Sequence, residues 1–422
     1  MYDREGGGGG CSKCIFHRVI SDLVRTGESL NDRNRIHRHL SLGLFMIKMD
    51  RRAFLSTGVS AVIAGCTSSE VDGEEPERTD SIDEMFEETP EQNDSNIAWE
   101  TDIPEPNAGP LGYNDQIYLP IQNYLIAFDE LTGHGLWEGE VFRGANGAPF
   151  LTEDRAYVPS RQGGVYGFNH SGTLDWRVER DHFSPRTPVV TDEMVFSGRS
   201  DIAVMSIDDE EVIAEVTRGG SFDFTADSNT IYFVLRERDG ISHSHVFRAV
   251  DFTTGEVLWS VDYSYSDFSQ PQIVGDEILV KHDSNLISLD KSTGEEVWRQ
   301  SFANSFGYSV IGEPGSDDTR LYVRERDSGR RRDTIYAFHY PIREQKWSYS
   351  RDYELLEGPV VTDGSLFVTG SDNEITQLDP TDGSVSGRVQ LDRPIGQPTV
   401  TNEMVVVLSS RNEILGIRRE VF

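Results

Sequence analysis

The most informative stretch of the sequence is Val250-Asp251-Phe252-Thr253-Thr254-Gly255, with Trp259 eight positions after the aspartate. The pattern recurs in Phe128-Asp129-Glu130-Leu131-Thr132-Gly133 with Trp137, and in Leu289-Asp290-Lys291-Ser292-Thr293-Gly294 with Trp298. An aspartate at the end of a strand can accept hydrogen bonds from turn N–H groups, and glycine permits a positive φ. The pattern therefore predicts a strand, a tight turn and a further strand that carries the tryptophan.

Weaker copies fill the intervals between these three. They are Asn169 with Trp176, His339 with Trp347, Asp379 with Gly387 in the tryptophan place, and Ile207-Asp208 with Val216. With Trp99, the tryptophan positions are 99, 137, 176, 216, 259, 298, 347 and 387. A spacing of about 40 residues is typical of β-propellers, in which each unit is a four-stranded antiparallel blade. We predict an all-β, eight-bladed propeller over residues 98–422. Seven blades is the alternative, because the Val216 copy is poor.

Short β-branched or aromatic runs bounded by turn residues supply the strands. They are Gln116–Leu119, Arg155–Val158, Thr230–Val234, Arg320–Val323 and Ser365–Val368. We expect the strand at residues 98–101 to pair with residues 413–417, because that closure removes free sheet edges.

The repeated residues predict cohesion between blades and not chemistry, since one tryptophan ring buries about 150–250 Å². We expect the following residues to dock the blades: Trp99, Asp129, Gly133, Trp137, Trp176, Asp251, Gly255, Trp259, Asp290, Gly294, Trp298 and Trp347.

The repeat resembles that of the pyrroloquinoline-quinone (PQQ)-type propellers, found in quinoprotein alcohol dehydrogenases and in the outer-membrane assembly lipoprotein BamB. The resemblance covers about residues 99–422 and implies eight blades. For the dehydrogenases it also implies a quinone with calcium in the central channel and a vicinal disulfide. This sequence has three cysteines, Cys11, Cys14 and Cys66, all of them before the repeats. No residues match the calcium ligands or the aspartate base.

The chain is strongly acidic, with 39 Lys+Arg against 72 Asp+Glu and a formal charge of −33. Nucleic acid is therefore not an expected partner, because phosphate binding needs a basic surface. Few of the basic residues are lysine, and an acidic, lysine-poor surface is typical of proteins adapted to concentrated salt, where charge repulsion is screened. An acidic protein in ordinary salt is the alternative.

The N-terminal region has the features of an export signal. Arg51 and Arg52 precede a short apolar stretch that ends in Ile63-Ala64-Gly65-Cys66, the layout of a twin-arginine lipoprotein signal at residues 49–66. We expect a lipid on Cys66 and an extracytoplasmic, membrane-anchored domain. Residues 1–48 would be a disordered leader or a misassigned start, with Met49 as the true one. Residues 67–97 are acidic and poor in apolar residues, which predicts a disordered tether.

Four other groups of residues are candidate sites. Cys11 and Cys14 with His17, His37 and His39 could bind a metal or belong to the leader, and His243 with His245 could bind a metal or lie on a solvated edge. Asp208-Asp209-Glu210-Glu211 could attract calcium or form a solvated turn. The arginines 324, 326 and 330–332 could form a docking spot or pair with acids.

The sequence thus predicts a monomeric, non-catalytic scaffold that binds a protein partner or an extracellular ligand, with no cofactor. The alternative is a quinoprotein-like dehydrogenase, or a degenerate propeller that still binds PQQ with calcium.

Overall fold

The computed structural model describes residues 85–86, 96–161, 163–180, 186–198, 201–217, 224–239, 242–264, 268–303, 305–311, 320–327, 329, 332–340, 344–356, 358–362 and 364–422. The chain divides into residues 1–77 and Arg78–Phe422, and the description below concerns the second unit. The predicted leader, Arg51, Arg52 and Cys66 lie outside the described residues. None of the helices in the described ranges is long and apolar enough to cross a membrane.

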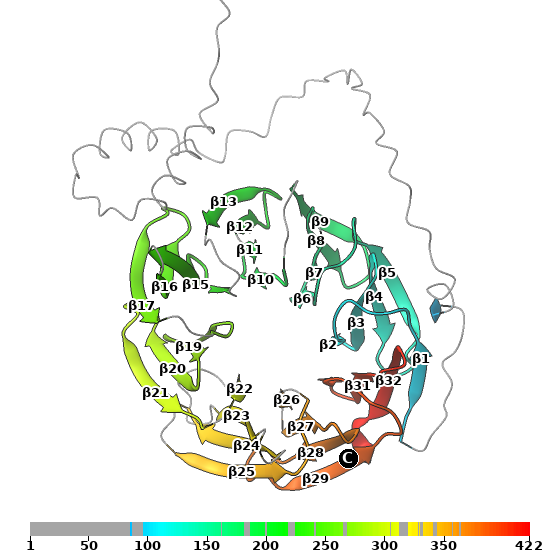
Figure 1. Ribbon diagram of the computed structural model, residues 1–422. Helices are drawn as coiled ribbons and strands as arrows, with labels where there is room; N and C mark the ends of the chain where they lie inside the picture. Colours follow the sequence, from blue (N-terminus) through cyan, green and yellow to red (C-terminus); the bar gives the residue numbers. More distant parts are fainter. Residues whose placement is uncertain are drawn as a thin grey trace, which may run out of the picture. The chain divides into compact units, whose positions relative to one another are not determined.

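The described residues form eight four-stranded antiparallel sheets arranged around a ring (Figure 1). Blade 1 contains β2 (Leu111–Tyr113), β3 (Gln116–Ile121), β4 (Tyr124–Asp129) and β5 (Gly135–Glu140), and blade 2 contains β6 (Phe150–Leu151), β7 (Arg155–Pro159), β8 (Gly164–Asn169) and β9 (Leu174–Glu179). Blade 3 contains β10 (Val189–Val190), β11 (Met194–Ser197), β12 (Asp201–Ser206) and β13 (Val212–Thr217), and blade 4 contains β14 (Phe224–Ala226), β15 (Thr230–Asp239), β16 (Ser242–Asp251) and β17 (Val257–Ser264).

Blade 5 contains β18 (Gln272–Val274), β19 (Glu277–His282), β20 (Asn285–Asp290) and β21 (Glu296–Ser301), and blade 6 contains β22 (Ser305–Ile311), β23 (Arg320–Asp327), β24 (Arg332–His339) and β25 (Gln345–Arg351). Blade 7 contains β26 (Val360–Thr362), β27 (Ser365–Thr369), β28 (Glu374–Leu378) and β29 (Val385–Gln390), and blade 8 contains β30 (Thr399–Val400), β31 (Met404–Leu408), β32 (Glu413–Arg418) and β1 (Trp99–Asp102). A 3₁₀ turn, η1 (Arg419–Val421), follows β32.

The ring closes as the sequence predicts. Strand β1 pairs antiparallel with β32, with Trp99 opposite Gly416 and Asp102 opposite Glu413. The degenerate copy that ends at Val216 forms a complete blade, β10 to β13, so the prediction of eight blades is confirmed over the seven-bladed alternative. The outermost strand of blade 8 therefore comes from the start of the propeller, and its three inner strands come from the end.

The predicted strand runs are the second strands of their blades. Residues 117–121 of β3 and 125–128 of β4 are continuously buried, without the alternation of a half-exposed strand. Both faces of each blade pack against neighbouring blades, so apolar residues are favoured on both.

Tryptophans link several of the described blades to the next. In five seams the indole N–H donates to a backbone carbonyl oxygen in the turn of the following blade. These bonds are Trp99 to Glu130 (2.8 Å), Trp137 to His170 (3.1 Å), Trp176 to Ile207 (3.1 Å), Trp259 to Lys291 (3.0 Å) and Trp347 to Pro380 (2.9 Å). The ring of Trp259 covers Gly294, where φ is +74° and a Cβ would come within 2.6 Å of the ring. Glycine is required there both for the turn and for the indole.

The aspartates of the repeat accept hydrogen bonds from the turns that follow them. Asp251 accepts hydrogen bonds from the backbone N–H groups of Thr253 (2.8 Å) and Thr254 (2.9 Å) and from the Thr253 hydroxyl (2.6 Å). Burial opposes the charged form, but these bonds outweigh it and lower the pKa of Asp251. Asp129 and Asp290 accept equivalent bonds in blades 1 and 5.

The two copies without tryptophan are completed differently. At Val216, Phe252 from the following blade fills the space and packs against Phe196, with ring centroids 5.3 Å apart. At Gly387, the backbone of Phe422 lies where a side chain would be. The C-terminus of the chain thus supplies the missing packing.

The segment predicted as a tether, residues 67–97, reaches the propeller core at two places. Met85 is 3% exposed and Ile97 is 7% exposed, and both belong to hydrophobic clusters with residues of the blades. A disordered tether does not extend to these residues.

Candidate interaction face

One face of the propeller carries the loops that lie outside the repeat. Because adjacent strands are antiparallel, the hairpins between second and third strands emerge on the same side as the connections between blades. We call this side the loop face, and the opposite side, which carries the Asp-Thr-Gly turns, the turn face. Several connections form a single bridge to the end of a second strand, such as Ala145 to Ser160 and Ile395 to Ser409. The loops of the face are therefore attached to the sheets beneath them.

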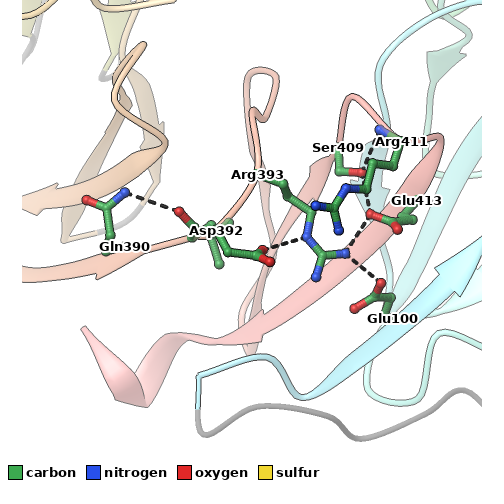
Figure 2. Close-up of polar contacts among 8 residues, drawn as sticks. Glu100, Gln390, Asp392, Arg393, Ser409, Arg411 and Glu413 are labelled. Carbon is green, nitrogen blue, oxygen red and sulfur yellow. Dashed lines mark hydrogen bonds and ion pairs between the residues drawn. The ribbon is translucent and has the colours of Figure 1, made fainter.

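Arg393 holds the loop face together at the ring closure (Figure 2). It lies in the connection between β29 and β30 and forms ion pairs with Glu100 (2.6 Å), Glu413 (2.6 Å) and Asp392 (2.7 Å). Its side chain is 11% exposed. Hydrogen bonds to Asp392 and Glu413 raise the pKa of Arg393. The guanidinium thus joins the first strand of the propeller to the last blade.

The carboxylate of Glu413 is fixed by two donors. The Ser409 hydroxyl donates to Glu413 Oε2 at 2.6 Å, beside the bond from Arg393. Burial opposes ionisation, but these two bonds outweigh it and lower the pKa of Glu413. Glu413 is therefore charged, and its carboxylate is held by Ser409 and Arg393, which indicates a structural function.

A second paired arginine lies at the end of β25. Arg351 donates to Asp372 (2.7 Å) and forms an ion pair with Glu374 (3.0 Å), both on or beside the β27–β28 hairpin. Its side chain is only 8% exposed. This arginine therefore joins blades 6 and 7 on the loop face.

Two of the five arginines predicted as a docking spot, Arg324 and Arg326, pair with a buried acid. Asp333 is fully buried and forms ion pairs with Arg324 (3.1 Å) and Arg326 (3.5 Å). The same carboxylate accepts the Leu355 N–H at 2.8 Å. The docking hypothesis is therefore wrong for Arg324 and Arg326, which pair with an acid as in the alternative; Arg330 and Arg331 lie outside the described residues.

A histidine cluster occupies the loop face of blades 4 and 5. The His282 ring packs against Tyr263 and Phe268, with centroid separations of 4.8 Å for both. Both ring nitrogens of His282 are buried, and neither has a hydrogen-bond partner among the residues that the structure describes. Burial lowers the pKa of His282. His245 is 1% exposed beside Phe268, so the prediction of a solvated edge is wrong for this residue.

In the described part of the face, the aromatic side chains of Phe142 and Tyr353 are open to solvent. Phe142, after β5, is 52% exposed, and Tyr353, after β25, is 53% exposed. Each lies near an arginine: the Arg143 guanidinium carbon is 5.0 Å from the Phe142 ring centroid, and that of Arg351 is 5.7 Å from the Tyr353 ring. Exposed aromatic residues beside arginine are typical of the contact residues of protein interfaces.

The predicted repeat residues do not belong to this face, because they form the seams and the turn face. Asp208, Asp209, Glu210 and Glu211 form an exposed turn, as the solvated alternative predicts. Cys11 and Cys14 with their neighbouring histidines lie outside the described residues. Sequence reasoning missed Phe142 and Tyr353, although each is an aromatic residue in a polar segment between two repeats.

A bound metal ion requires a group of His, Cys, Asp or Glu side chains. Within the described ranges, no three His, Cys, Asp or Glu side chains come together in a way that could hold a metal ion. The carboxylates that do cluster are paired with arginines, as at Arg393 and Arg351.

The chain matches the family model described as outer membrane protein assembly factor BamB over residues 90–227, 242–357 and 352–420. Among solved structures, BamB from Moraxella catarrhalis superposes with a TM-score of 0.54 at 14% identity, covering 76% of this chain and 99% of that one. The quinohemoprotein alcohol dehydrogenase ADHIIG from Pseudomonas putida HK5 gives 0.55 at 10% identity, covering 81% and 79%. At these identities the likeness concerns the fold alone.

The sequence is also similar to a quinoprotein ethanol dehydrogenase of Pseudomonas putida, with 32% identity over 100 residues. That alignment spans 21% of this chain and 15% of the enzyme. The similarity is thus local and covers a small part of the enzyme.

Proposed function

Since the chain belongs to the family of the outer membrane protein assembly factor BamB, we propose that it is a membrane-anchored, extracytoplasmic scaffold that binds a protein partner through its loop face. BamB itself is an assembly factor by name. The proposal takes from it a function in protein interaction and names no partner.

The observation that supports the proposal is that charged residues of the loop face are paired, whereas aromatic residues of the same face are exposed. The charged residues Arg393, Arg351 and Asp333 are engaged in ion pairs that attach loops to blades. Phe142 and Tyr353 are about half exposed, although each has an apolar ring. An arrangement in which polar groups hold the loops and aromatic rings stay accessible favours binding over chemistry.

Anchoring is proposed from the N-terminal sequence. Arg51, Arg52 and Cys66 have the layout of a twin-arginine lipoprotein signal, and the acidic segment that follows would hold the propeller off the membrane. Mass spectrometry of membrane-extracted protein should find a diacyl- or triacyl-modified N-terminal Cys66. Recovery of a protein that still contains residues 49–65 would contradict this part.

Site-specific photo-crosslinking tests the binding face. A crosslinking amino acid is placed at position 142, at position 353, or at Leu131, which is 44% exposed on the turn face and serves as the matched control. We expect a defined adduct from positions 142 and 353 in intact cells, and none from position 131. Adducts from position 131 alone would reject the loop face.

The alternative is a PQQ-binding dehydrogenase, and the local similarity to quinoprotein ethanol dehydrogenase favours it. Addition of PQQ and calcium separates the two functions, because a ligand that binds the folded state raises its stability. The scaffold proposal expects no change in Tm and no alcohol-dependent dye reduction. A rise of several degrees, or dye reduction, would support the dehydrogenase.

A further inference from the structure

A short segment far upstream of β1 packs on the outside of blade 1. Met85 is 3% exposed and belongs to the hydrophobic cluster of Trp99, Ile103 and Ile117, and Phe86 packs against the same cluster. Figure 1 shows this segment in blue beside β1 and β5. The pair lies in an otherwise acidic stretch, Asp83-Glu84-Met85-Phe86-Glu87-Glu88.

The seat of this pair is Gly135, the first residue of β5. It is buried, and a Cβ there would come within 2.9 Å of the Phe86 ring and 3.0 Å of the Met85 carbonyl oxygen. The positions that correspond to it in blades 4 and 7, six residues after the turn aspartate, are Val257 and Val385. They are 42% and 39% exposed. The outer strand of blade 1 is thus covered where these two strands are open, and a residue without a side chain makes room for the cover.

We propose that Met85 and Phe86 form a strap, an apolar pair of this chain that docks in cis at the seam of blades 8 and 1. The pair packs in the cluster of Trp99 on β1 and lies over Gly135 on β5. The strap fixes the point at which the preceding residues leave the propeller. It also adds a contact to β1, the strand that closes the ring.

The strap deepens the proposed function, because it sets the length of the tether. With a lipid on Cys66, the segment between lipid and strap is residues 67–84, whose root-mean-square span is about 23 Å for a flexible chain. Without the strap, the tether would extend to residue 95 and span about 30 Å. This consequence depends on the lipid, but the docking of the strap does not.

Glutamate-specific proteolysis of the purified chain tests the docking. In the wild-type protein we expect Glu84 and Glu87 to be cut at least about 10-fold more slowly than Glu74 and Glu77, because they flank a docked pair. In the variant M85S/F86S the difference should disappear, hydrogen exchange in β1 and β5 should become faster, and Tm should fall by a few degrees. The matched control is V257S/L258S, an adjacent apolar pair that is 42% and 49% exposed; it should change none of these readouts.

A second variant removes the seat and keeps the strap. Gly135→Ala places a methyl group against the Phe86 ring, and Gly135 does not have a positive φ, so the backbone tolerates alanine. We expect G135A to expose Glu84 and Glu87 to the protease as M85S/F86S does. Equal cleavage in the wild-type protein and in both variants would overturn the strap. The experiment uses protein without lipid or partner, so it can fail while the scaffold proposal stands.

Discussion

The backbone of Phe422, the last residue of the chain, lies against Gly387, in the position that a tryptophan occupies in the complete copies of the repeat. The Phe422 ring packs edge-to-face on Phe367, with centroids 5.4 Å apart. The seventh blade is therefore sealed to the eighth by the C-terminus. Gly387, which replaces the tryptophan of the repeat, thus leaves room for the Phe422 backbone.

Restoring the tryptophan at this position should destabilise the protein. Gly387→Trp matches the repeat, but its side chain would overlap the Phe422 backbone, and overpacking of this kind costs about 1–3 kcal/mol. We expect a lower midpoint in denaturant unfolding. Removal of residues 419–422 from the same variant should recover part of the loss, whereas that deletion in the wild-type chain should lower stability. A G387W protein as stable as the wild type would show that the C-terminus does not occupy this place.

Trp99 should contribute more than packing to ring closure. Trp99→Ala removes a ring that is 1% exposed and should cost about 3–5 kcal/mol. Trp99→Phe keeps an aromatic ring but loses the N–H bond to the Glu130 carbonyl, which leaves a buried acceptor without its donor and should cost about 1–3 kcal/mol. Chemical denaturation measures both. A W99F protein as stable as the wild type would mean that the hydrogen bond is irrelevant.

Arg393 should be needed for the same closure on the loop face. Arg393→Ala leaves Glu100 and Glu413 without their cation, and breaking a largely buried pair costs about 3 kcal/mol. Arg393→Lys should recover part of this, since lysine keeps the charge but not the planar set of donors. Thermal unfolding provides the measurement, with the exposed Arg418→Ala as control. A loss at Arg418 equal to that at Arg393 would reject a specific network.

Glu130 should favour the folded state more at acidic pH than at neutral pH. Its side chain is 1% exposed, and burial raises its pKa, with Asp115, Glu403 and Asp129 adding to the effect and a hydrogen bond from Thr401 opposing it. A raised pKa contributes stability that is present below the unfolded value and is lost as pH rises through the folded value. We therefore expect Glu130→Gln to raise Tm at pH 7–8 and to leave it unchanged near pH 4. The exposed Glu105→Gln should raise it at neither pH.

His282 should act in the opposite pH direction. Burial lowers its pKa, so the folded state favours the neutral ring, and stability should fall as pH drops below the ordinary value of about 6.5 through the folded one. The charged and titratable groups around it are Asp283, Arg299, His245 and Glu296, with Tyr263 against the ring. His282→Phe keeps the packing and should flatten the pH dependence of Tm between pH 7 and 5. An unchanged slope would assign that dependence to other groups.

The sequence by itself determined the repeated parts of the molecule. The interval from Asp251 to Trp259 encodes a turn and the strand that follows it, which are local structures, and recurrence at about 40 residues sets the number of blades. The pairing of β1 with β32 also followed, because a closed ring needs a last strand. Even the weak copy at Val216 could be placed by its spacing alone.

Only the tertiary structure decided what the non-repeating residues do. Arg393 and Glu100 are 293 positions apart and meet because the ring closes, and no local pattern encodes that distance. The same holds for Phe422 at Gly387 and for Met85 in the cluster of Trp99. Loops between repeats have no periodicity to read, and their partners are set by which blades become neighbours. The residues of the candidate face could therefore be identified only from the three-dimensional structure.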